Sequence, residues 1–162
     1  MAEKDENGGA ARETHEERIN RELIELLNEL RVALPGVQVL FAFLLAVPFT
    51  QRFRQLTDGQ EYAFFLSLLC TTGGSALLIA PSAYHRLRFR DHDKEQMLRT
   101  ANRLSIAGTV LLAVAMTSAV YLITDLVFNA ALTVIVTVLT AATFAWFWYG
   151  LPLIRKVQDQ RQ

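Results

Sequence analysis

The chain has 162 residues, is 52% hydrophobic and carries no formal net charge, because sixteen basic side chains balance sixteen acidic ones. The absence of an overall basic excess argues against a nucleic-acid partner. A single cysteine excludes an intramolecular disulfide and any cysteine-rich metal centre.

The N-terminal part of the chain is polar and lacks the apolar core of a signal peptide. Residues 1–13 are small and polar, with a glycine pair, and are expected to form a disordered tail. Apolar side chains then recur at helical spacing and predict a cytoplasmic amphipathic helix over residues 14–31. The opposite face is mainly acidic, which favours contact with the same chain or a second copy over an anionic membrane surface.

Four later stretches are long and apolar enough to cross a bilayer core of about 30 Å, which takes roughly 20 helical residues. They cover residues 32–50, 62–80, 104–124 and 128–154, and none contains Asp, Glu, Lys, Arg or His. Helices are the expected form, because lipid leaves the hydrogen bonds of an isolated strand open. The sequence therefore predicts an all-α integral membrane four-helix bundle over residues 32–154, preceded by the amphipathic helix and followed by a cytoplasmic tail over residues 155–162.

Prolines interrupt the predicted helices at two places. Pro35 and Gly36 predict a kink or break where the amphipathic helix enters the first span. Pro81 directly follows the second span and predicts its end. In the next connection, Asp93 and Gln96 have the spacing of a helix N-cap and its partner, so the third helix is expected to begin well before residue 104.

The lysine and arginine distribution predicts the orientation of the four spans. Fourteen of the sixteen basic residues lie before the first span, between the second and third, or after the fourth, and two lie between the first and second. The sequence therefore places both termini on the cytoplasmic side.

A histidine and three arginines follow the second span, and they are candidate contacts for anionic lipid headgroups: His85, Arg86, Arg88 and Arg90. Basic clusters beside a membrane span attract acidic lipids. The simpler interpretation is a cationic anchor at a helix C-terminus, where the helix dipole and the positive-inside rule both favour positive charge. The same arginines are also expected to meet the acidic face of the N-terminal helix at Glu22, Glu25 and Glu29.

Polar and small residues inside the spans are candidates for helix packing or for a transport pathway: Gln38, Thr71, Thr72, Gly73, Gly74, Thr133, Thr137 and Thr140. Glycines and hydroxyls in lipid usually serve close helix packing and hydrogen bonds between helices. A glycine pair also allows a loosened helix whose carbonyls face an ion or substrate. Gln38 is expected to bond to another helix. We favour packing at all of these positions.

The spans contain none of the side chains that proton-coupled transport or catalysis usually needs. An intramembrane ionisable residue is normal in proton-coupled carriers, and none is present here. No nucleophile–base pair, metal-ligand cluster, phosphate loop or paired haem ligands occur in the spans. We therefore expect no enzyme activity, no catalytic residues, no metal and no cofactor.

Three sequence blocks resemble a family of small bacterial four-span membrane proteins that is defined only as a domain of unknown function. They are "RELIELLNELRVALPGVQVLFAFLLAVPF" (21–49), "LLIAPSAYHRLRFR" (77–90) and "ANRLSIAG" (101–108). Similar sequences sometimes carry an automatic sodium:proton antiporter label, which the residues of this chain do not support. The resemblance implies a location in the bacterial cytoplasmic (inner) membrane. It also implies that the cytoplasmic half is a defined structure, and it transfers no functional residues.

Three functional hypotheses remain after these observations. The first is a non-enzymatic accessory or scaffold protein, or a small component of a homo-oligomer or larger membrane complex. The second is a small oligomeric ion or solute transporter or channel. The third is a protein that binds anionic membrane lipids.

Overall fold

A computed structural model describes residues 15–87 and 94–150 of the chain, and the side chains of residues 15, 16, 20, 84–87, 94 and 95 lie outside this description. Four α-helices account for most of it: α1 (His15–Ala46), α2 (Asp58–Leu87), α3 (Lys94–Val127) and α4 (Ala130–Phe144). Two short 3₁₀ segments, Val47–Phe49 and Gln51–Gln55, join α1 to α2, and a π-helical turn, Ala145–Gly150, continues α4. The described residues include no strand, and all four helices are long and apolar enough to cross a membrane. The predicted all-α four-helix membrane fold is confirmed.

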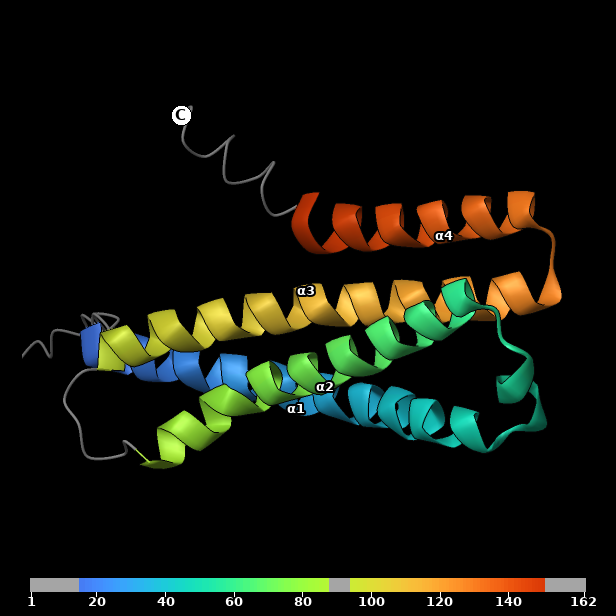
Figure 1. Ribbon diagram of the computed structural model, residues 1–162. Coiled ribbons are helices and arrows are strands. Elements are labelled where there is room, and N and C mark those ends of the chain that lie inside the picture. The colour runs from blue at the N-terminus through green and yellow to red at the C-terminus, as the bar shows by residue number, and fades with distance from the viewer. Residues whose placement is uncertain (1–14, 88–93, 151–162) are drawn as a thin grey trace, which may run out of the picture.

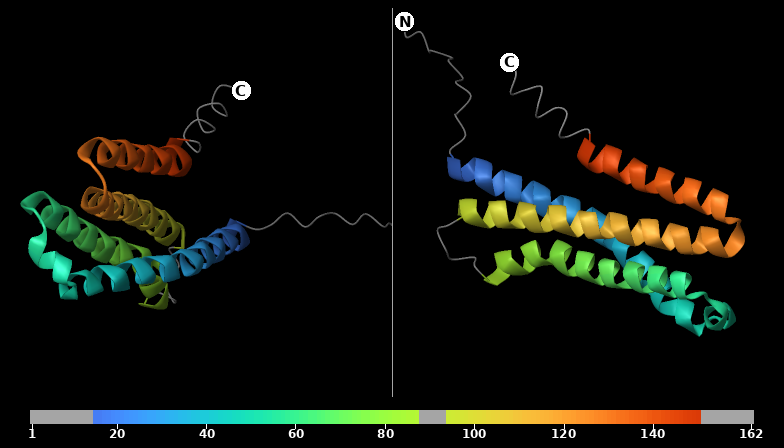
Figure 2. Two further views of the ribbon diagram at one scale, coloured as in Figure 1. Left: turned by 90° about the vertical axis from the view of Figure 1, so that its right-hand side faces the viewer. Right: turned by 45° about the horizontal axis from the view of Figure 1, so that its top comes forward.

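The helices form an uneven array in which α2 and α3 are the central pair (Figure 1). Helix α1 contacts both of them, whereas α4 contacts α3 and neither α1 nor α2. The two views in Figure 2 show α4 on the outer side of α3, away from α1. The bundle is therefore a three-helix group with a fourth helix packed on one flank.

At Pro35, where the sequence predicted a kink or break, helix α1 is unbroken. It runs through Pro35 and joins the predicted amphipathic helix and the first predicted span in one 32-residue element. Proline removes one backbone hydrogen bond, but packing on both sides of it holds the helix together. Leu30 and Val37 lie on either side of Pro35, and both are buried in one cluster with Leu78 and Leu112.

Helix α2 also passes through a proline at which the sequence predicted an end. Pro81 is buried within it, and the helix continues to Leu87. Leu78, one turn earlier, is fully buried against α1 and α3, so packing again outweighs the lost hydrogen bond. The basic segment after the second span therefore starts as helix.

Helix α3 begins at Lys94, well before the predicted span. Its proposed cap, Asp93, lies outside the described residues. Asn129 caps α4: its side-chain oxygen accepts a hydrogen bond from the Leu132 backbone N–H at 3.0 Å. Only Phe128 and Asn129 separate α3 from α4, so the two helices form an antiparallel hairpin.

The helix junctions lie at two ends of the molecule. The α1–α2 connection and the α3–α4 turn are at the same end, on the right of Figure 1. The start of α1, the end of α2 and the start of α3 are at the opposite end. This alternation is the arrangement expected of four consecutive membrane crossings.

Candidate functional site

The central candidate stretch, residues 70–75, packs tightly against α3 at its glycines. A β-carbon built on Gly74 would lie 3.1 Å from the Gly108 carbonyl oxygen, and one built on Gly108 would lie 2.8 Å from Leu78 Cγ. A β-carbon built on Gly73 would lie 3.1 Å from Leu111 Cδ1. The absence of side chains at these glycines lets the two backbones meet.

The hydroxyls of this stretch bond to helix backbone. Thr71 and Thr72 donate to the carbonyls of Ser67 and Leu68, one turn earlier in α2. Ser67, which is fully buried, donates across the interface to the Ala115 carbonyl of α3 at 2.8 Å. Helix α2 is continuous here, so the loosened-helix alternative does not describe this conformation.

A polar contact at the opposite end of the α2–α3 pair was not predicted. The Gln60 side-chain amide donates to an Asp125 carboxylate oxygen at 2.8 Å, and its own oxygen accepts from the Thr57 backbone N–H at 3.1 Å. Gln60 is buried, so it links the start of α2 to the end of α3. The sequence offered one signal, namely that the predicted topology placed both residues at the same membrane surface.

The threonine stripe of α4, formed by Thr133, Thr137 and Thr140, lies toward α3. Thr133 is almost completely buried, and it donates to the Asn129 carbonyl one turn earlier. Thr140 likewise donates to the Val136 carbonyl. The Thr137 hydroxyl is buried without a hydrogen-bond partner among the described residues. The stripe therefore serves contact between the two helices.

A first groove opens between α3 and α4 in the half of the hairpin that lies away from the α3–α4 turn. It has a volume of about 280 Å³ and is lined mainly by small and apolar side chains, among them Val114, Ala141 and Phe144. The Tyr149 hydroxyl lies 2.9 Å from the Thr109 hydroxyl and joins the π-helical turn to α3. Thr117 and Ser118, two small polar residues of α3, also line this groove.

A second groove of about 540 Å³ lies between α1 and the end of α2. Polar side chains line it along α1, at Asn28, Arg31 and Gln38, and Ser82 lines it from α2. Gln38 is exposed and forms no hydrogen bond to a described residue, so the expected bond to another helix stays a prediction. It points instead to this groove.

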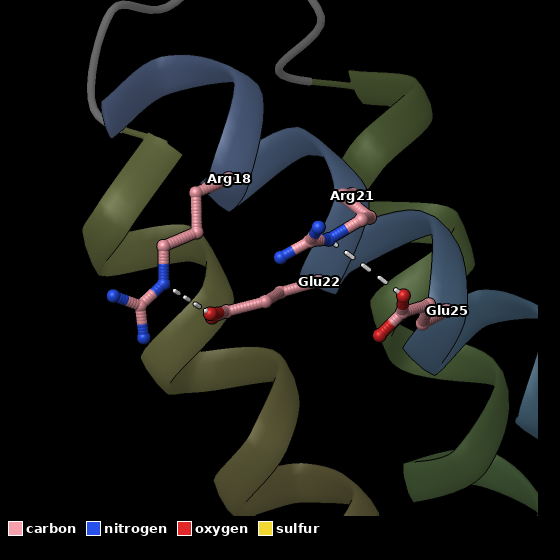
Figure 3. Close-up of polar contacts among 4 residues, drawn as sticks. All are labelled: Arg18, Arg21, Glu22 and Glu25. Atoms are coloured by element: carbon pink, nitrogen blue, oxygen red, sulfur yellow. Dashed lines mark hydrogen bonds and ion pairs between the residues drawn. The ribbon is translucent and has the colours of Figure 1, made fainter. Parts of the chain in front are cut away.

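The basic cluster after the second span is only partly described. The backbones of His85 and Arg86 belong to the last turn of α2, whereas Arg88 and Arg90 lie outside the described residues. The acidic face expected to meet these arginines forms ion pairs within α1 (Figure 3). Arg18 pairs with Glu22 at 2.8 Å, and Arg21 with Glu25 at 3.8 Å.

A sequence profile of one protein family matches residues 12–152, which include every described residue. The chain belongs to DUF6328, a family of unknown function. The residues that match DUF6328 include both grooves and the α2–α3 contact, and the family description assigns no activity to them. Searches of curated proteins and of solved structures gave no match.

Proposed function

We propose that this protein is a non-enzymatic, multi-pass component of the bacterial inner membrane. In this proposal it acts as an accessory or scaffold protein by assembling with a second copy of itself in the plane of the membrane. Helix α4 provides the contact, and both termini are cytoplasmic.

The position of α4 is the observation that supports this proposal most directly. In the most apolar stretch of α4, 6% of the residues are buried, against 33% in the corresponding stretch of α2. Because α4 contacts only α3 among the described helices, most of its circumference is available to lipid or to another protein.

The face of α4 opposite α3 has a composition suited to helix association. Small and β-branched residues follow one another there at intervals of four, three and four positions, and all are exposed: Ala131, Ile135, Val138 and Ala142. At 3.6 residues per turn this stripe lies roughly opposite Thr133 and Thr137. Small residues allow close backbone approach between membrane helices, and β-branched residues have little rotamer freedom to lose.

A second copy is the simplest occupant of this stripe. Identical stripes meet across a two-fold axis and form a self-complementary interface, the commonest symmetry of oligomers. The basic residues support the orientation, since fourteen of sixteen lie in the sequence before the first span, between the second and third, or after the fourth.

Native mass spectrometry of protein extracted in mild detergent tests the proposal. We expect a dimer for the wild type and at least a tenfold weaker dimer for Ala142→Leu, because the larger side chain prevents close approach. The matched control is Thr143→Leu, an exposed position next to the stripe, which should leave the dimer intact. A monomeric wild type, or equal loss in both variants, would contradict the proposal. Ion flux through proteoliposomes of purified protein would support transport in its place.

A further inference from the structure

We propose that the groove between α1 and α2 binds the phosphate of an anionic phospholipid, with the Arg31 guanidinium as the principal contact. Gln38 and Ser82 would hold the polar atoms nearer the acyl chains. This proposal concerns a different surface from the α4 stripe and does not depend on the proposed dimer.

The groove combines an apolar wall with a graded series of polar side chains. Ile24, Leu27 and Leu34 supply the apolar part. Asn28, Arg31 and Gln38 follow one another on the same side of α1, at intervals of three and seven residues. Ten residues of helix span about 15 Å, which is about half the thickness of a bilayer core. The groove therefore extends from the membrane surface into one leaflet.

Arg31 is suited to an anion because it has no ion-pair partner among the described residues. At about 100° per residue, Glu29 lies about 160° around α1 from Arg31. Glu22 and Glu25 lie on that far side too, and each already pairs within the helix (Figure 3). A guanidinium binds two phosphate oxygens at once, which gives both strength and orientation.

Pro35 adds a hydrogen-bond acceptor to the same groove. Proline has no backbone N–H, so the Arg31 carbonyl, four residues earlier, lacks its usual helical donor. Pro35 itself lines the groove. A cation and a free carbonyl close to one another suit a headgroup that carries a phosphate and a hydroxyl, as phosphatidylglycerol does.

The location of the groove favours a membrane lipid over a soluble phosphate. It lies on the helix segment Glu17–Phe49, which is apolar enough to cross a membrane. Its apolar wall has no use for inorganic phosphate but suits the upper part of an acyl chain. His85 and Arg86 follow Ser82 by three and four positions in α2, so the same end of the helix carries further basic residues.

Lipid exchange into nanodiscs provides the test. The full-length protein is reconstituted in phosphatidylcholine, and phosphatidylglycerol binding is measured by native mass spectrometry across a titration. We expect Arg31→Gln to weaken phosphatidylglycerol binding by at least about tenfold, the loss expected for hydrogen bonds to a charged group. Arg103→Gln is the control: it removes an exposed arginine from the first part of α3 and should change binding less than twofold.

Two further measurements distinguish a specific lipid site from general attraction between charges. Gln38→Leu leaves the charge unchanged and should still weaken binding several-fold. Excess inorganic phosphate should not displace the lipid. The proposal fails if Arg31→Gln and Arg103→Gln have equal effects, if Gln38→Leu has none, or if inorganic phosphate competes. Each altered residue is exposed, so unchanged thermal unfolding serves as the check that the variants fold.

Discussion

The α2–α3 contact makes a sharp prediction for Gly108→Ala. The added β-carbon would lie 2.8 and 2.9 Å from Leu78 Cγ and Cδ2 and 3.2 Å from the Gly74 carbonyl oxygen. Leu78 is fully buried, so it has little room to move away. Overpacking of this kind typically costs about 1–3 kcal/mol of stability, and we expect a cost in this range for Gly108→Ala.

Gly36→Ala is the matched control, because a β-carbon there meets no atom within 4 Å. Both glycines lie inside helices, so both variants gain a similar helix propensity, up to about 1 kcal/mol. This gain cancels in the comparison, and the difference between the variants isolates the steric cost. We therefore expect Gly108→Ala to be less stable than Gly36→Ala by about 1–3 kcal/mol.

Unfolding by sodium dodecyl sulfate in mixed micelles, followed by circular dichroism, measures this difference. A double variant with Leu78→Ala adds a second test, because the cavity it leaves can accept the new methyl group. The combined cost should fall below the sum of the single costs by about 0.5–3 kcal/mol. Equal stability of the two glycine variants, or strict additivity with Leu78→Ala, would refute the close contact.

Three further predictions concern polar contacts and topology. Ser67→Ala removes a buried hydrogen bond between helices and should cost about 0.6 kcal/mol in the same unfolding assay. Thr137→Val removes a buried hydroxyl that has no partner among the described residues, so it should be neutral or stabilising. The reverse order would contradict the contacts described. Gln60→Leu leaves two polar groups without their partner and should cost about 1–3 kcal/mol, and no loss of stability would argue against the bridge. In a cysteine-free background, Gly59→Cys should react with an impermeant thiol reagent from outside the cell and Asp91→Cys should not; the opposite pattern would invert the topology.

The helices could be predicted because lipid imposes simple requirements on length and polarity. Each apolar stretch found in the sequence corresponds to one long helix. Neither α1 nor α2 ends at its proline, Pro35 or Pro81, and the reason is the same for both. A proline weakens a helix locally, but tertiary packing around Leu30, Val37 and Leu78 decides whether the helix continues.

The arrangement of the helices was harder to predict than their existence. Apolar residues cover all sides of α4, so hydrophobic periodicity could not show that α3 is its sole neighbour in the described structure. The Gln60–Asp125 bridge joins residues 65 positions apart, and no local pattern marks such a pair. Gln38 was predicted as a bonding partner from its polarity alone, but its position beside the α1–α2 groove depends on how the two helices cross.

Cysteine cross-linking in native membranes tests the proposed assembly most directly. Val138→Cys places a thiol on the face of α4 opposite α3, and Leu69→Cys places one at an exposed position of α2. In a background without Cys70, mild oxidation should convert the Val138→Cys protein, but not the Leu69→Cys protein, into a disulfide-linked dimer. Equal cross-linking at both positions, or none at Val138→Cys, would contradict assembly through α4.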